Sequence, residues 1–196
     1  MEIILASASP RRKKLLSALF SEFRVVPSDI REMVPRHMPV DKCPEYLAGM
    51  KAESVARENP KALVIGCDTS VIIDGKMLNK PRSTADARMM MQLLSGKTHQ
   101  VITGCCLYYM GKSITFSEVT GVEFYKLTEE EIEQYVNTTE PYDKAGGYGI
   151  QNKGAFFIKG IKGDYYNVVG LPLARLKREV DIFLSQDFSE QPSGRK

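Results

Sequence analysis

The sequence lacks long apolar runs, and this absence argues against a membrane-spanning helix. No apolar run approaches the roughly 18 residues that such a helix requires, and the N-terminus has no signal-peptide h-region. The sequence therefore predicts a cytoplasmic protein with no membrane partner.

Side chains that bind soft metals are scarce as well, because the chain holds only four cysteines and two histidines. The cysteines show no CxxC spacing, which argues against a zinc site and, in a chain of this size, against a disulfide framework. Cys67 and Cys105 lie in apolar runs and are expected to be small buried hydrophobic residues. His37 lies in a polar stretch and is expected to be solvated. Any metal bound here would be a hard cation held by carboxylates.

A strong charge imbalance is also missing. The net charge is +3, and basic side chains do not alternate with aromatic ones, so a nucleic-acid partner is not expected. Neither a GxxxxGK[ST] P-loop nor a GxGxxG dinucleotide fingerprint occurs. Any phosphate site must therefore be built in another way.

What remains is the composition of an ordinary globular protein, with 196 residues of which 43% are hydrophobic. No internal repeat or linker divides the chain. We expect a single α/β domain over residues 1–185 and a polar, disordered C-terminal tail over residues 186–196.

Periodicity and capping residues predict a mixed, largely antiparallel sheet flanked by helices. The expected helices cover residues 10–20, 41–58 (capped by Asp41), 83–94 (capped by Ser83 or Thr84), 128–136 (with a Thr128–Glu131 capping box) and 172–184. The expected strands cover residues 3–6, 23–26, 63–73 with an interruption at 68–69, 77–78 after a turn at 74–75, 101–110, 113–125, and a hairpin of 155–161 with 165–169.

The stretch from Ile3 to Leu16 breaks a local rule of helix stability. Ser9 suits an N-cap and Pro10 the first helical position, after a short apolar strand. Four cations at residues 11–14 then fill the first turn, where the helix dipole already supplies about half a positive charge. A solvated helix face explains the composition but not the position. The placement favours a site for an anion such as phosphate.

Asp68 interrupts an apolar strand, where an unpaired carboxylate would be costly to bury. A solvent-facing strand position or a bulge would explain it without function. The functional interpretation is a carboxylate held at a strand end or bend, as a base or a magnesium ligand. Glu32 is a second candidate carboxylate, although it is a weak one when taken alone.

Two later segments add polar groups. In Lys80-Pro81-Arg82 the proline fixes the local backbone, which favours a positioned lysine. The tripeptide alone fits a phosphate site and a surface loop equally well. Residues 146–149 contain three glycines that permit close approach to a ligand, and Gln151 follows them with an amide suited to reading a base edge. A mobile loop is the alternative. Together the features indicate a nucleoside triphosphate enzyme.

Several segments carry a resemblance that spans nearly the whole chain. They are LASASPRR (5–12), the Glu32 region, MKAESVA (50–56), IGCDTSVIIDGKMLNKPR (65–82), LSGKTHQVITG (94–104), EPYDKAGGYGIQ (140–151) and GDYYNVVGLPL (163–173). In this order the chain resembles the Maf family of nucleoside triphosphate pyrophosphatases, also known as septum formation inhibitor proteins.

The resemblance implies an ITPase-like (Maf/Ham1) α/β fold with two lobes around a cleft. It also implies hydrolysis between the α and β phosphates with Mg²⁺ or Mn²⁺, releasing a monophosphate and pyrophosphate. The GGYGIQ form resembles the branch that acts on dTTP and UTP, in a role that cleanses the nucleotide pool, and modified pyrimidine nucleotides are implied as substrates. A homodimer is expected because similar proteins form dimers.

Site residues follow from the same resemblance. Asp68 matches the family's proton acceptor, and Glu32 with Asp68 would hold the metal. The positions associated with substrate choice are Arg12, Thr69 and Gln151, and the phosphate-side positions are Ser7, Ser9, Arg11, Lys51 and Lys80. Two mild departures are Cys67 in place of the usual Ala and Asn79 before Lys80 in place of Gly or Glu.

A non-enzymatic regulator that binds nucleotide or a cell-division partner is the alternative function that the family's older name suggests. A pure triphosphate binder would have little use for the carboxylate of Asp68 beside the anion. The enzyme is therefore the favoured interpretation.

Overall fold

The computed structural model describes residues 1–186, so nearly all of the expected disordered tail lies outside the described residues. The strands are β1 (Ile3–Ala6), β2 (Arg24–Val25), β3 (Leu63–Ile73), β4 (Lys76–Leu78), β5 (Thr98–Tyr109), β6 (Lys112–Phe124) and β7 (Ile158–Lys162). The helices are α1 (Pro10–Leu16), α2 (Cys43–Glu58), α3 (Thr84–Leu94), α4 (Glu129–Val136), α5 (Tyr165–Val169) and α6 (Leu173–Leu184). Short 3₁₀ helices are η1 (Glu140–Asp143), η2 (Ala145–Gly147) and η3 (Lys153–Phe157).

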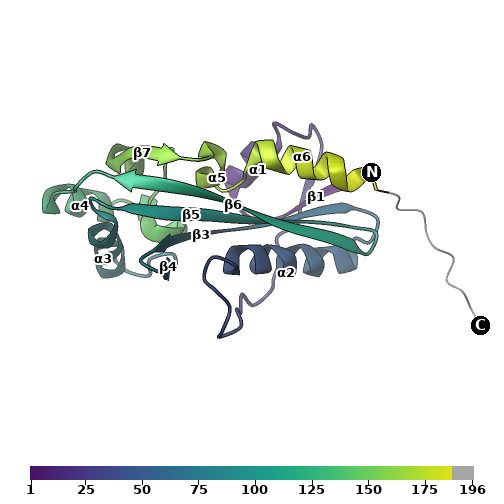
Figure 1. Cartoon of the computed structure of the whole chain (residues 1–196), viewed down its shortest axis with the longest axis horizontal. Helices are drawn as coiled ribbons and strands as arrows, with labels where there is room; N and C mark the ends of the chain where they lie inside the picture. Colours follow the sequence, from purple (N-terminus) through teal and green to yellow (C-terminus); the bar gives the residue numbers. More distant parts are fainter. Residues whose placement is uncertain (187–196) are drawn as a thin grey trace, which may run out of the picture.

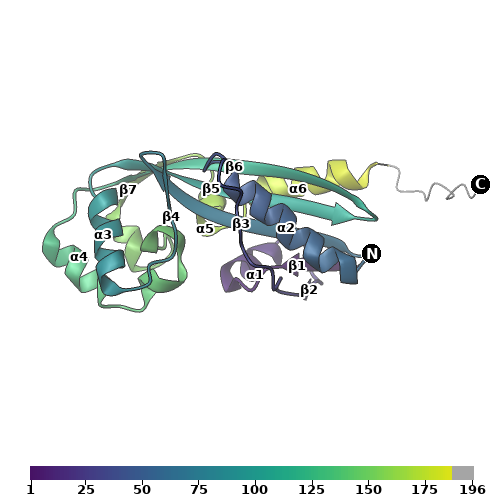
Figure 2. The ribbon, with the colours of Figure 1, turned by 90° about the horizontal axis from the view of Figure 1, so that it is seen from below.

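The strands form one sheet in the order β2-β1-β3-β5-β6-β7, with β4 paired to β3. β1 runs parallel to both of its neighbours, and the other pairings are antiparallel. Figures 1 and 2 show α2 against one face of the long strands, α1 and α6 on the other side, and α3 and α4 near one end of the sheet. The predicted mixed, largely antiparallel sheet flanked by helices is confirmed.

Local capping chemistry places several helix ends where the sequence predicts them. Ser83 caps α3 by accepting a hydrogen bond from the Asp86 N–H at 3.1 Å. The capping box of α4 forms between Thr128 and Glu131. The β3–β4 turn places Asp74 at φ 50° and Gly75 at φ 70°, the left-handed region that an Asp-Gly turn supplies.

Three boundaries differ from the sequence-based prediction. α1 ends at Leu16 instead of near residue 20, because the Ser17 hydroxyl donates to the Lys14 carbonyl and the next two N–H groups, of residues 18 and 19, bond three residues back. The N-cap of α2 is Lys42, without a side-chain cap, and not Asp41. β3 runs unbroken through Asp68 and keeps its register against β5 there.

The predicted hairpin between residues 155–161 and 165–169 is wrong. β7 pairs with β6, whereas Tyr165–Val169 forms helix α5. Asp164 accepts a hydrogen bond from the Tyr166 N–H at 2.8 Å and so caps this helix. The N-cap therefore outweighs the strand preference of the tyrosines and valines that follow it.

The buried core divides along the length of β3. In its first half, Leu63 and Ile65 pack with residues of α1 and α6, while Val64 packs with α2 on the opposite face. In its second half, Val71 and Ile73 pack with residues of α3 and α4. The segment 68–70 lies between these cores, which accounts for the two-lobed arrangement.

His99 on β5 predicts an acid-sensitive fold. The ring is 2% exposed, its Nε2 lies 2.7 Å from the Tyr148 hydroxyl, and its Nδ1 has no partner among the described residues. Burial lowers the pKa of His99 to about 4 from the ordinary 6.5, so the unfolded chain binds a proton that the folded chain refuses between these values. Stability is full above pH 6.5 and should fall by about 3 kcal/mol as the pH drops from 7 to 4.

Urea unfolding at pH 7 and pH 4 measures this change, and His99→Asn should reduce the pH dependence. His37→Gln is the matched control, because His37 is the other histidine and is exposed. Equal pH dependence in the parent and His99→Asn would contradict the assignment.

Candidate functional site

One edge of β3 is open in the middle of the strand. The pairing with β1 ends at Gly66, and the pairing with β4 begins at Val71. Between these residues, the described chain places no strand on that edge, although β5 continues to pair on the other edge. Ligand-facing groups from both faces of the sheet can therefore reach the same opening.

A cavity of about 720 Å³ lies at this open edge. It falls in the size range typical of small-molecule sites. Every site residue expected from the sequence lines it, namely Ser7, Ser9, Arg11, Arg12, Glu32, Lys51, Asp68, Thr69, Lys80 and Gln151. Its charged lining comprises Arg11, Arg12, Lys51, Lys80, Arg82 and Lys144 against Glu32, Asp68 and Asp143. The excess of cations makes the cavity suited to a polyanion.

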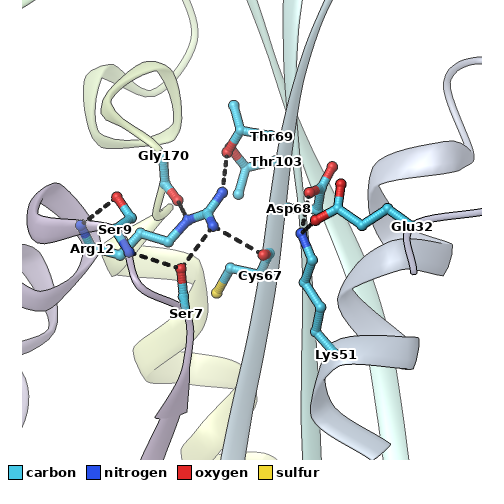
Figure 3. Close-up of polar contacts among 10 residues, drawn as sticks. All are labelled: Ser7, Ser9, Arg12, Glu32, Lys51, Cys67, Asp68, Thr69, Thr103 and Gly170. Carbon is cyan, nitrogen blue, oxygen red and sulfur yellow. Dashed lines mark hydrogen bonds and ion pairs between the residues drawn. The ribbon is translucent and has the colours of Figure 1, made fainter. Parts of the chain in front are cut away.

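On the α2 side of β3, two carboxylates converge on one ammonium group. Lys51 Nζ lies 2.6 Å from Asp68 Oδ1 and 2.7 Å from Glu32 Oε1 (Figure 3). Glu32 is half exposed, whereas the side chains of Lys51 and Asp68 are only 10% and 13% exposed. Lys51 is buried among the apolar residues of α2 although it is charged, because the two paired carboxylates compensate its ammonium group.

Burial also changes the pKa of Asp68. Loss of solvent raises the pKa of the Asp68 carboxyl, and the nearby charges of Lys51 and Arg12 oppose this rise. A base is most effective when its pKa approaches the working pH, so the shift suits proton acceptance.

On the opposite side of β3, the guanidinium of Arg12 is held by protein acceptors. It donates from Nε to the Gly170 carbonyl at 2.9 Å and from Nη1 to Ser7 Oγ and the Cys67 carbonyl, each at 3.0 Å. Its Nη2 donates to Thr69 Oγ1 at 2.8 Å. Figure 3 shows this network and the Lys51 cluster on opposite sides of the strand. Strand alternation explains the division, because Asp68 and Thr69 are consecutive.

The N-terminal stretch forms the predicted helix start, but only some of the cations at residues 11–14 line the cavity. Ser9 caps α1 by accepting from the Arg12 N–H at 3.4 Å, with Pro10 at the first position. Lys13 and Lys14 are exposed and do not line the cavity, so they behave as a solvated face. α1 is only seven residues long, and Arg11 provides the cation at this wall, 2.9 Å from Asp143.

The glycine-rich segment contributes Tyr148 and Gly149 to the cavity lining. Gly146 has φ 71°, and its N–H donates to the Asn79 carbonyl at 3.2 Å. A Cβ atom there would lie 2.8 Å from a methyl carbon of Val71, so only glycine fits. Gln151 follows as an exposed residue of the cavity lining.

Sequence reasoning missed several polar residues near the opening. Lys144 lines the cavity and its Nζ lies 2.5 Å from Asp143 Oδ1. Both residues belong to the segment 140–151, but no role was predicted for them from the sequence. Thr103 and Asn167 are fully buried beneath Thr69. The signal that could have found them is a hydrogen-bonding side chain within an apolar run, as with Asp68.

The donor set fits a hard divalent cation only in part. Within residues 1–186, no group of three or more His, Cys, Asp or Glu side chains could hold a metal ion. Two carboxylates, Glu32 and Asp68, contact the same nitrogen and therefore lie close together. Mg²⁺ commonly uses one or two carboxylates and completes its shell with water and substrate phosphates. The site thus fits a cation that arrives with a phosphate ligand.

These observations place the chain in a class of mixed α/β proteins that have a cation-rich cavity lined by a buried carboxylate. The sequence comparison narrows this class, since the profile described as Maf-like protein matches residues 2–183. The chain belongs to the Maf family.

Two curated relatives match nearly the whole chain. A dTTP/UTP pyrophosphatase of Bacillus pumilus (strain SAFR-032) is 48% identical over 182 residues, which cover 93% of this chain and 96% of the relative. One of Bacillus cytotoxicus, with the same name, is 50% identical over 182 residues, covering 93% and 95%. The structure of the Staphylococcus aureus Ham1 protein matches 63% of this chain and 72% of its own, with a TM-score of 0.48 and 17% identity.

Among the described residues, no helix combines the length and the apolar character that crossing a bilayer demands.

Proposed function

We propose that this protein hydrolyses dTTP and UTP between the α and β phosphates, releasing the nucleoside monophosphate and pyrophosphate. The observation that carries the proposal is the buried Asp68 beside Lys51, facing a cavity with more cations than carboxylates. The names of the two Bacillus relatives support the choice of substrates. Modified pyrimidine triphosphates belong to the same substrate class.

In the proposed reaction, water attacks the α-phosphorus, and the bond from this phosphorus to the bridging oxygen breaks. Asp68 accepts the proton of the attacking water, and the electron pair leaves with pyrophosphate. Arg11, Lys51 and Lys80 bind the triphosphate, each charge-assisted hydrogen bond contributing roughly 1.5–3 kcal/mol. Ser7 and Ser9 add hydroxyl groups on the phosphate side.

Glu32 and Asp68 would hold Mg²⁺ or Mn²⁺ on the α2 side of the strand. Such an ion supplies charge neutralisation of the phosphate oxygens. Lys51 contacts both carboxylates, so it keeps them together and limits their mutual repulsion before a cation binds.

Two residues of the cavity lining would contact the nucleobase in this proposal. Gln151 offers a donor and an acceptor at the cavity wall, and Thr69 offers a hydroxyl. Arg12 donates its hydrogen bonds to the protein, so its part in substrate choice is to fix Thr69 and the Gly170 loop.

A nucleotide panel tests the function. With Mg²⁺ or Mn²⁺, pyrophosphate release should be faster from dTTP and UTP than from other canonical triphosphates, and EDTA should abolish it. Release of pyrophosphate and not of orthophosphate identifies the α–β bond as the one that breaks. Gln151→Ala should narrow the gap between pyrimidines and purines.

Failure to release pyrophosphate from any canonical or modified triphosphate would overturn the enzyme assignment and favour the nucleotide-binding regulator.

We further propose that residues 1–185 form a single domain, that the protein is cytoplasmic, and that it forms a homodimer without nucleic-acid partners. Gel filtration with light scattering tests the dimer.

A further inference from the structure

A buried chain of hydroxyl and amide groups runs from the cavity into the protein. Thr69 and Thr103 are register partners on β3 and β5, and their hydroxyl oxygens lie 2.9 Å apart. Thr103 Oγ1 lies 2.9 Å from the backbone carbonyl of Asn167 on α5. Thr103 and Asn167 are 0% exposed, whereas Thr69 reaches the cavity. Thr103 therefore does not line the cavity itself but contacts Thr69, which does.

The hydroxyl hydrogens of this series of hydrogen bonds can be oriented in only one consistent way. The Asn167 carbonyl can only accept, so the one hydroxyl hydrogen of Thr103 is donated there. Thr103 then has only lone pairs for Thr69, and Thr69 must donate its own hydrogen to Thr103. The Arg12 guanidinium, which can only donate, takes one lone pair of Thr69. Thr69 is left with a lone pair and no hydrogen for the cavity.

The Asn167 side chain holds this arrangement in place. Its Oδ1 accepts from the Thr103 N–H at 3.1 Å, and its Nδ2 donates to the Val101 carbonyl at 3.0 Å. Nδ2 also donates to Thr120 Oγ1 at 2.9 Å, and that hydroxyl donates to the Asp164 carbonyl at 3.0 Å. Backbone groups on both sides thus fix the orientation of the amide.

We propose that Thr103, anchored by Asn167, is a positioning residue. It makes Thr69 a hydrogen-bond acceptor, and not a donor, toward the nucleobase of the substrate. The inference rests on the proposed function. Uracil and thymine carry a hydrogen on N3 and can donate to Thr69, whereas N3 of cytosine presents a lone pair. An acceptor facing an acceptor leaves both unpaired, which disfavours cytosine nucleotides.

Thr103→Val tests the proposal, because valine keeps the branched shape and removes the hydroxyl. Without Thr103 as acceptor, the Thr69 hydrogen is free to turn toward the cavity. The ratio of kcat/KM for UTP to that for CTP should fall at least about tenfold, mainly through a gain for CTP. Thr103→Ser, which restores the hydroxyl, should recover the parental ratio.

Thr120→Val is the matched control. Thr120 is also a 0% exposed threonine bound to Asn167, but it does not contact Thr69. Its substitution should lower stability and leave the UTP-to-CTP ratio unchanged. An unchanged ratio in Thr103→Val, or an equal fall in both valine variants, overturns the proposal.

Binding separates this proposal from the function itself. Dissociation constants for the non-hydrolysable α,β-imido analogues of UTP and CTP report base choice without catalysis. A parent that prefers the UTP analogue but releases no pyrophosphate overturns the enzyme assignment, and the variants still test the hydroxyl chain. A parent that releases pyrophosphate but has the same kcat/KM for UTP and CTP overturns the inference about base choice and leaves the enzyme assignment standing.

Discussion

Asp68→Asn is expected to slow pyrophosphate release from dTTP by about 10²–10⁴-fold while the fold stays intact, as is typical when a positioned general base is removed. The amide has nearly the same shape as the carboxylate but cannot accept the proton of water. Glu32 still binds Lys51 in this variant, so the buried ammonium keeps one partner. Steady-state kinetics and urea unfolding measure the two effects separately.

Asp74→Asn is the matched control for Asp68→Asn. Asp74 directly follows the same strand, is exposed, and has φ 50°, which asparagine tolerates. The activity of Asp74→Asn should equal that of the parent. Parental turnover of dTTP by Asp68→Asn would show that another group accepts the proton.

The pH profile adds a signature. Because burial raises the pKa of Asp68, kcat/KM of the parent should fall on the acid side of a pKa above the ordinary aspartate range. The carboxylate is the active form, so activity is present above this pKa and lost below it. Asp68→Asn should lack this acid limb.

Gly66→Ala is expected to destabilise the fold by about 3 kcal/mol or more, the upper range for overpacking in a core. A Cβ at Gly66 would lie 2.2 Å from the Ala48 carbonyl oxygen and 2.8 Å from the Ala52 nitrogen, both backbone atoms of α2. The helix must therefore move away from the sheet. Lys51 lies on this helix, so any folded fraction should also lose activity.

Gly160→Ala is the control for this effect. Gly160 lies on β7 of the same sheet, and nothing lies within 4 Å of a Cβ built there. Unfolding free energies from urea titrations compare the two variants. Equal stability of Gly66→Ala and Gly160→Ala would contradict the close packing of α2.

Local chemistry made much of the fold predictable. Ser9, Ser83 and the Thr128–Glu131 box cap helices where the sequence indicates, because a cap depends on neighbours within one turn. The same reasoning failed at residues 165–169. There the strand preference of tyrosine and valine obscured the N-cap Asp164.

Sequence motifs and periodicity were enough to predict the family, the largely antiparallel sheet and the residues that line the cavity. The division of those residues between the two sides of β3 depends on the tertiary structure. The open edge of β3 arises because β1 and β4 stop short of each other, and strand alternation then turns Asp68 to Lys51 and Thr69 to Arg12. Contacts of this kind join residues far apart in sequence, so no local sequence pattern predicts them.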